Sequence, residues 1–132
     1  LKDETRFLKC EDSVVFLPFT DNPYPYIKNA LFTVLTSNFE GFPLSLIESL
    51  ACATPIVSVD CKTGPSEIII NNYNGLLVKP NDMDAFVDAL NLMITKMSLE
   101  ELSLNAKKSS SKFSQKQIAT SWKEVVSDLT MK

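Results

Sequence analysis

Residues 30–60, ALFTVLTSNFEGFPLSLIESLACATPIVSVD, contain two short apolar runs separated by a loop and a helix pattern. The runs at 30–37 and 55–60 are rich in apolar and β-branched residues, which predicts buried strands. Pro43 fixes its own φ and suits the first position of a helix. No glycine or proline occurs from Leu44 to Ala53, so we expect a helix there. Strand, helix and strand in this order predict two parallel neighbours joined by a crossover.

Two further runs extend the same pattern along the chain. SVVFLPF at 13–19 and GLLVKP at 75–80 also read as buried strands, which makes four in all. Short helical stretches are expected near 24–28 and 66–70. This alternation predicts the α/β class, as a Rossmann-like parallel sheet with helices on both faces. Ligands of such sheets bind beyond the carboxyl ends of the strands.

The pattern after residue 80 is entirely helical. We expect helices at 82–95, 99–108 and 115–129, with a short polar hinge before the last one. The first of them has an apolar stripe of Met83, Phe86, Val87, Leu90 and Ile94. Trp122 belongs to the stripe of the last helix, where packing is a better explanation than substrate stacking.

Composition restricts the size and the partners of the protein. The chain has 132 residues, of which 45% are hydrophobic, enough for one domain with a real core. Its 13 Lys and Arg stand against 16 Asp and Glu, without a basic stripe, so nucleic acid binding has no support. No run reaches the roughly 18 apolar residues of a membrane span, and the charged first residues do not form an export signal. We therefore expect no transmembrane segment and a cytoplasmic location.

Two residue types bear on the available chemistry. The three cysteines, Cys10, Cys52 and Cys61, are odd in number and lack metal-type spacing, which favours reduced thiols. Histidine is absent, which removes the commonest general base and metal ligand, and any Ser-His or Cys-His couple. We expect no metal site.

Glu40 and Glu48 are the acids that stand out, eight positions apart. With Gly41 read as the residue of a sharp turn and Pro43 behind it, Glu40 belongs to a loop, whereas Glu48 lies in the second turn of the helix. The helix start could also hold a phosphate on the backbone N–H groups of residues 44–46. Each acid has a simpler explanation. Glu40 could be a loop acid that interacts with the helix dipole, and Glu48 could be one of a solvated strip, with Ser45 and Ser49.

Three ordered segments carry a family resemblance. TSNFEGFPLSLIESLACATPIVS at 36–58 resembles the core signature of the family 4 glycosyltransferases, retaining enzymes of the GT-B fold, with their E-x7-E motif at Glu40 and Glu48. CKTGPSEII is similar to that family's next loop, and NNYNGLLVKPND to its following strand and turn. The resemblance covers most of residues 13–95. One departure is Ala53, where the family commonly has glycine, which hints at a looser approach of helix to strand.

The resemblance implies a role for each matching residue. It assigns Glu40 to the donor sugar beside the reacting carbon, as the catalytic residue, and Glu48 to the ribose of the nucleotide. The donor sugar and diphosphate would contact Glu40, Gly41, Phe42, Pro43, Leu44 and Ser45. Glu67 ranks third, although residues 64–67 also read as a turn in which Ser66 caps a short helix, so a structural role is at least as good an explanation. Lys62 could approach phosphate, or simply meet water.

The resemblance also implies a reaction and a larger protein. The chain at 1–132 looks like most of a C-terminal donor domain, without its first strand-helix units and without an N-terminal acceptor domain. It would bind a nucleotide-diphosphate sugar, UDP-linked, and transfer a hexosyl group with retention, using no cofactor. The acceptor would be a glycan or a lipid-linked sugar of bacterial surface polysaccharide synthesis, bound through the missing domain, which could bring the protein to the inner face of the membrane. The alternative from another class is a non-catalytic nucleotide-binding or protein-interaction module.

Overall fold

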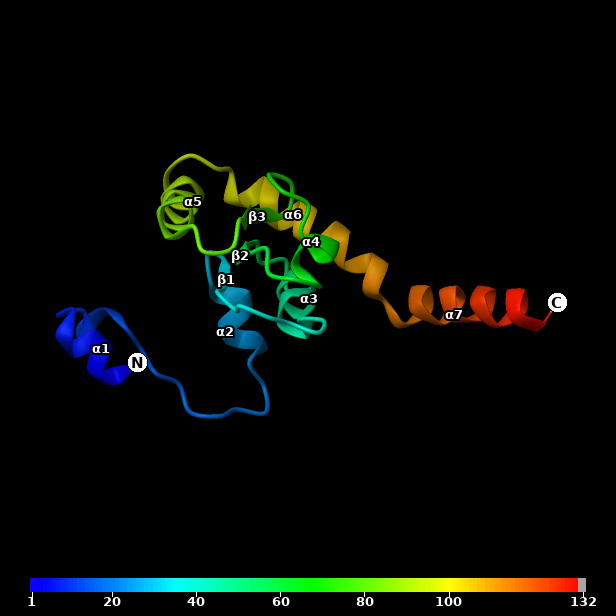
Figure 1. Ribbon diagram of the computed structural model, residues 1–132, viewed down its shortest axis with the longest axis horizontal. Coiled ribbons are helices and arrows are strands. Elements are labelled where there is room, and N and C mark those ends of the chain that lie inside the picture. The colour runs from blue at the N-terminus through cyan, green and yellow to red at the C-terminus, as the bar shows by residue number, and fades with distance from the viewer. Residues whose placement is uncertain (131–132) are drawn as a thin grey trace.

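The computed structural model describes residues 1–130 and contains a parallel three-stranded sheet with helices packed around it (Figure 1). The strands are β1 (Thr33–Leu35), β2 (Ile56–Val59) and β3 (Gly75–Val78), in that order across the sheet. The α-helices are α1 (Lys2–Phe7), α2 (Tyr24–Asn29), α3 (Leu44–Ala51), α4 (Pro65–Ile68), α5 (Met83–Thr95), α6 (Leu99–Ser110) and α7 (Gln115–Thr130). Two 3-10 helices are η1 (Glu11–Ser13) and η2 (Ser111–Phe113). Positions 131–132 of the predicted domain lie outside the described residues.

The parallel register divides the core into two clusters on opposite faces of the sheet. Val57 is paired with Leu76, and Ile56 with Gly75. One cluster lies between the sheet and α5 and consists of Val57, Leu76, Val78, Phe86, Ala89, Met93 and Leu102. The other lies between the sheet, α3 and α4 and consists of Leu46, Leu50, Ile56, Ile68, Ile69 and Ala106. Helix α6 contributes to both. The prediction of an α/β sheet with helices on both faces and a helical C-terminus is confirmed.

The predicted strand at 13–19 is wrong. After η1 this segment runs without a strand partner among the described residues, and Val15 and Phe19 are 81% and 92% exposed. Figure 1 shows it as a long connection between α1, which lies apart, and α2. A strand needs a neighbour for its backbone N–H and C=O groups, and apolar composition does not supply one. The sheet therefore has three described strands rather than four.

The apolar stripe of α5 is only partly as predicted. Phe86 is buried, but Met83 and Ile94 are 72% and 59% exposed, and Ala89 and Met93 take their place against the sheet. The face of α5 that packs on the sheet is therefore offset from the predicted stripe. It includes one small and one flexible side chain, which fit against the neighbouring strands. In contrast, α7 has the predicted helical spacing but no buried residue, and Figure 1 shows it projecting from the rest of the chain.

The end of α3 gives a physical reason for the unusual Ala53. Its φ is +62°, and its N–H donates to the carbonyl of Leu50 while that of Thr54 donates to the carbonyl of Ser49. This is a Schellman motif, in which the residue after the cap adopts the left-handed conformation that glycine prefers. The departure at Ala53 thus has a second explanation, beside the expected looser approach of helix to strand. The difference from glycine lies in the backbone conformation.

Candidate functional site

The loop between β1 and α3 holds Glu40 at the carboxyl end of the sheet. Glu40 is half-buried on this loop, and α3 begins at Leu44, so the predicted loop and helix positions of the two acids are confirmed. Pro43 is buried just before the first helical residue. Gly41 has no positive φ, and a Cβ built there would meet nothing within 4 Å. The chain does bend at Gly41, but this bend does not require the left-handed conformation that favours glycine, and the position where a side chain would lie is open space.

A second loop, between β2 and α4, joins the first. Phe39 and Lys62 form an isolated parallel bridge, and the Thr63 hydroxyl donates to the backbone carbonyl of Glu40. Gly64 has φ +98°, and a Cβ there would lie 2.3 Å from Cδ of Pro43. The two motifs that the sequence separates by some twenty residues thus form one structural unit at the carboxyl ends of β1 and β2.

Thr63 is a residue of this unit that the sequence did not single out. It is β-branched yet has φ +68°, a conformation that such residues rarely adopt. Its hydroxyl oxygen lies within hydrogen-bond distance of the Glu40 carbonyl and, at 2.6 Å, of the Lys62 carbonyl, and its single proton donates to one of them at a time. A side chain that bridges two loops compensates part of the backbone strain. No sequence pattern indicates this, because the contact spans separate loops.

Glu48 lies in the second turn of α3 and is half-buried. The hydroxyl of Tyr24, at the start of α2, donates to its Oε1 at 3.4 Å. The predicted solvated strip is wrong for Ser49, which is fully buried and whose hydroxyl lies 2.7 Å from that of Thr33. Glu48 therefore lies between the buried side of α3, where Ser49 contacts Thr33, and the protein surface. Tyr24 was missed as a site residue, since the pattern at 24–28 indicated only a helix.

The start of α3 has free backbone donors, although fewer than expected. The N–H of Leu46 donates to the carbonyl of Pro43 at 3.1 Å, so it does not face a ligand. The N–H groups of Leu44 and Ser45 have no hydrogen bond to another described residue, and both side chains are exposed. Two N–H groups at this helix end are thus open to an anion.

The remaining predicted residues have local partners. Glu67 accepts the Gly64 N–H at 3.1 Å at the start of α4, and its own N–H donates to the Gly64 carbonyl, which supports the structural explanation for this acid. The predicted cap at Ser66 is wrong, because Gly64 is the N-cap of α4. Phe42 packs edge-on against Phe113, with ring centroids 6.1 Å apart. Lys62 is exposed, and its backbone forms the bridge between the loops.

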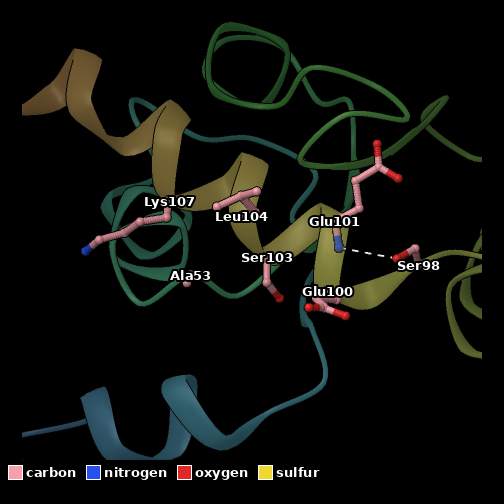
Figure 2. A pocket seen from close by; sticks show the side chains of 7 residues that line it. All are labelled: Ala53, Ser98, Glu100, Glu101, Ser103, Leu104 and Lys107. Carbon is pink, nitrogen blue, oxygen red and sulfur yellow. Dashed lines mark hydrogen bonds between the residues drawn. The ribbon is translucent and has the colours of Figure 1, made fainter.

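Two hollows of the surface can be compared with the position of the two loops. One of about 640 Å³ lies between the end of α3 and α6 (Figure 2), and it is lined by Ala53, Ser98, Glu100, Glu101, Ser103, Leu104 and Lys107. Its lysine donates to the Ala51 carbonyl at 2.7 Å, and it contains none of the residues of the two loops. A smaller hollow of about 260 Å³ follows the carboxyl ends of the strands and is lined by Thr36, Asn38, Val59, Asn81, Asp82, Met83 and Phe86. This one borders the loop of Glu40, where ligands of parallel sheets bind.

Residues 1–130 contain neither a metal-site cluster nor a membrane-spanning helix. No cluster of His, Cys, Asp and Glu there has the arrangement of a metal site. None of the helices in this range combines the length and apolar character needed to cross a bilayer. The three cysteines are free thiols.

Comparisons with curated proteins identify relatives of the chain. The family model of the glycosyl transferases group 1 matches residues 1–112. The lipopolysaccharide 1,6-galactosyltransferase of Escherichia coli (strain K12) is 38% identical over 93 residues, which cover 67% of this chain and 26% of that protein. The N-acetylgalactosamine-N,N'-diacetylbacillosaminyl-diphospho-undecaprenol 4-alpha-N-acetylgalactosaminyltransferase of Campylobacter jejuni is 36% identical over 116 residues, covering 85% of this chain and 32% of that protein. The chain thus spans about a third or less of these relatives.

Solved structures give the same fold. The apo form of the lipopolysaccharide outer core galactosyltransferase WaaB has a TM-score of 0.85 at 25% identity, covering 96% of this chain and 36% of that one. The pneumococcal O-GlcNAc transferase GtfA in complex with UDP and GlcNAc has a TM-score of 0.83 at 18% identity, covering 99% of this chain and 27% of that one. The sheet and its helices correspond to one Rossmann-like half of the GT-B fold. With its match over residues 1–112, the chain belongs to the glycosyl transferases group 1 family.

Proposed function

We propose that this chain is the donor-binding domain of a retaining glycosyltransferase that transfers a hexosyl group from a nucleotide-diphosphate sugar. The observation that carries the proposal is the joining of the Glu40 and Gly64 loops at the carboxyl ends of β1 and β2, in a member of this family. A site there is formed by two loops on a rigid sheet, which is the usual place for nucleotide ligands in this fold class. The rest of the protein would complete the domain and supply the acceptor site.

The two acids of the E-x7-E motif would bind opposite ends of the donor. Glu40, on the loop, would accept hydrogen bonds from the sugar hydroxyls beside the reacting carbon. Glu48, farther along α3, would accept hydrogen bonds from the ribose hydroxyls. Carboxylates suit both tasks because each has two oxygens that accept from neighbouring hydroxyls.

The diphosphate would lie at the start of α3. The free N–H groups of Leu44 and Ser45 and the positive end of the helix dipole support this position. The open space beside Gly41 would let the backbone of the loop approach the ligand. During transfer the bond from the anomeric carbon to the diphosphate oxygen would break, and the acceptor hydroxyl oxygen would bond to the same face while its proton passes to the departing diphosphate oxygen. Stabilising the departing diphosphate is the main catalytic task of such a site.

The donor is proposed to be UDP-linked and the acceptor a glycan or lipid-linked sugar of bacterial surface polysaccharide synthesis. The structurally similar GtfA complex contains UDP, which supports the base. The relatives from Escherichia coli and Campylobacter jejuni are named for lipopolysaccharide and undecaprenol-linked acceptors, which supports the acceptor class. The reaction would need no cofactor. A cytoplasmic enzyme working at the inner face of the membrane would fit such acceptors.

The alternative is a non-catalytic nucleotide-binding or interaction module. In that case the two acids would be surface residues without a shared ligand. The family match over residues 1–112 favours the enzyme. Under the proposal, the 132-residue chain alone should bind nucleotide but should not transfer sugar to added acceptors in an assay with radiolabelled donor.

Two substitutions in the full-length protein test the roles of the acids. Glu48→Ala should weaken UDP and the whole donor equally, by roughly 1.5–3 kcal/mol, because it removes charge-assisted hydrogen bonds. Glu40→Ala should leave UDP affinity nearly intact and lower kcat, because its partner is the sugar. Calorimetry measures the affinities and steady-state kinetics the turnover.

Glu100→Ala is the control for charge, since this acid is exposed at the start of α6. It should change neither binding nor turnover. Reversed effects of the two substitutions would mean that the roles are wrongly assigned. Wild-type behaviour of both variants would support the surface-residue alternative.

A further inference from the structure

Tyr24 is a side chain outside the family motif that contacts one of its acids. It is the first residue of α2, and its hydroxyl donates to Oε1 of Glu48 at 3.4 Å, across 24 positions of sequence. The ring is 48% exposed, so its hydroxyl is at the surface rather than within the core. The contact links α2 to the second turn of α3.

Helix α2 is held at its other end by a shorter and less exposed hydrogen bond. The hydroxyl of Thr54, a residue only 2% exposed, donates to the carbonyl of Ile27 at 2.8 Å. Thr54 also terminates α3, through its N–H on the Ser49 carbonyl. Both helices are therefore attached to the same turn, with Tyr24 at the start of α2 and Glu48 in the last turn of α3.

A glutamate that binds a ribose needs a fixed carboxylate. Its side chain has three rotatable bonds, and ordering them on binding lowers affinity. A phenol hydroxyl on Oε1 restricts these rotations before the ligand arrives and leaves Oε2, and the second lone pair of Oε1, to accept from hydroxyls. The half-buried position of Glu48 strengthens such a bond relative to one in water.

We infer that Tyr24 is a positioning residue that holds the Glu48 carboxylate for the ribose diol of a nucleoside diphosphate. This inference rests on the proposed ribose role of Glu48 and adds a residue from a different helix to the site. Tyr24 acts through Glu48, so its effect should depend on the ribose hydroxyls of the ligand and should vanish when Glu48 is absent.

The test uses calorimetry on the full-length protein with UDP, ADP and GDP, followed by the 2′-deoxy form of the tightest binder. Tyr24→Phe should weaken the ribonucleotide about fivefold, less than loss of a direct charged hydrogen bond would, and should leave the deoxynucleotide almost unchanged. Its preference for ribose over deoxyribose should fall accordingly. In a Glu48→Ala background, Tyr24→Phe should have no further effect.

Tyr26→Phe is the matched control, because Tyr26 lies on the same helix, is 55% exposed, and has no side-chain hydrogen bond to another described residue. It should bind like the wild type.

If the wild type binds none of the nucleotides, or Glu48→Ala binds as well as the wild type, the proposed function of Glu48 fails and the inference with it. If Glu48→Ala is weak but Tyr24→Phe keeps the wild-type ribose preference, only the inference on Tyr24 is overturned. Equal weakening of both sugar forms would also overturn it, since that result indicates a general effect on helix packing.

Discussion

At the scale of single residues, backbone conformation explains two positions that composition alone leaves ambiguous. Ala53 has the left-handed conformation at the end of α3, whereas Gly41, in the proposed donor loop, does not. A glycine in a turn motif is therefore not always there for its φ, and an alanine can occupy a position that would suit glycine better. Distinguishing the two cases requires the φ angle and the neighbouring atoms.

Ala53→Gly should stabilise the protein. The left-handed conformation costs an alanine roughly 1 kcal/mol relative to glycine, and the Schellman hydrogen bonds do not involve the side chain. Urea denaturation should show an increase of about this size in the free energy of unfolding. Ala51→Gly, within α3, is the control and should lower it by about 0.5–1 kcal/mol. A loss of stability in both variants would contradict the argument.

The two loop glycines should separate stability from binding. Gly64→Ala places a Cβ 2.3 Å from Cδ of Pro43 and keeps φ at +98°, so we expect a lower Tm and weaker UDP binding as the loops separate. Gly41→Ala meets no protein atom within 4 Å, so its Tm should stay near that of the wild type while UDP binding weakens. Thermal denaturation and calorimetry measure both. Unchanged UDP binding by Gly41→Ala would contradict the proposed ligand position.

At the scale of elements, α3 connects the core to the site. Its buried side, with Leu46 and Leu50, packs on the sheet, and its first turn and Glu48 face the proposed ligand. Local rules predicted this helix well, because Pro43 and the uninterrupted run after it mark its start. They predicted α5 less well, since which of several apolar residues faces the sheet depends on how the helix docks.

Leu50→Ala should test how far the stability of the domain depends on α3. Leu50 is fully buried, so its truncation should lower the free energy of unfolding by about 2–5 kcal/mol. Leu44→Ala is the matched control on the same helix, because Leu44 is 64% exposed, and it should change stability by about 0.5 kcal/mol or less. Chemical denaturation measures both. Similar losses for the two variants would mean that the packing of α3 is not as described.

At the scale of the whole molecule, α7 extends from the rest of the chain with an apolar stripe that includes Ile118, Trp122 and Leu129. Trp122 is 66% exposed and Ile118 44%, so the stripe is not covered by the described residues of this chain. A contiguous apolar stripe of this kind usually contacts another surface. Its spacing is helical whether or not that surface is present, so the sequence predicts the helix, whereas the surface that covers it depends on a partner.

The 132-residue chain alone should therefore associate with itself. Light scattering should show a mass that rises with concentration, and Trp122→Gln should reduce this rise by removing the largest apolar side chain of the stripe. Lys123→Gln, also exposed but polar, is the control and should associate like the wild type. A monomer at high concentration, with the fluorescence of a buried tryptophan, would contradict the prediction.

The sequence by itself determined the order of the elements and the local positions of the two acids. Proline, glycine and apolar periodicity act over a few residues, so they placed Glu40 on a loop, Glu48 on a helix and strands at 30–37, 55–60 and 75–80, within which the three shorter parallel strands lie. The tertiary structure decided what depends on distant partners. It left 13–19 without a strand neighbour, buried Ser49, joined Thr63 to the carbonyl of Glu40 and brought Tyr24 to Glu48. These outcomes depend on which surfaces meet when the chain folds, and neither composition nor spacing specifies that.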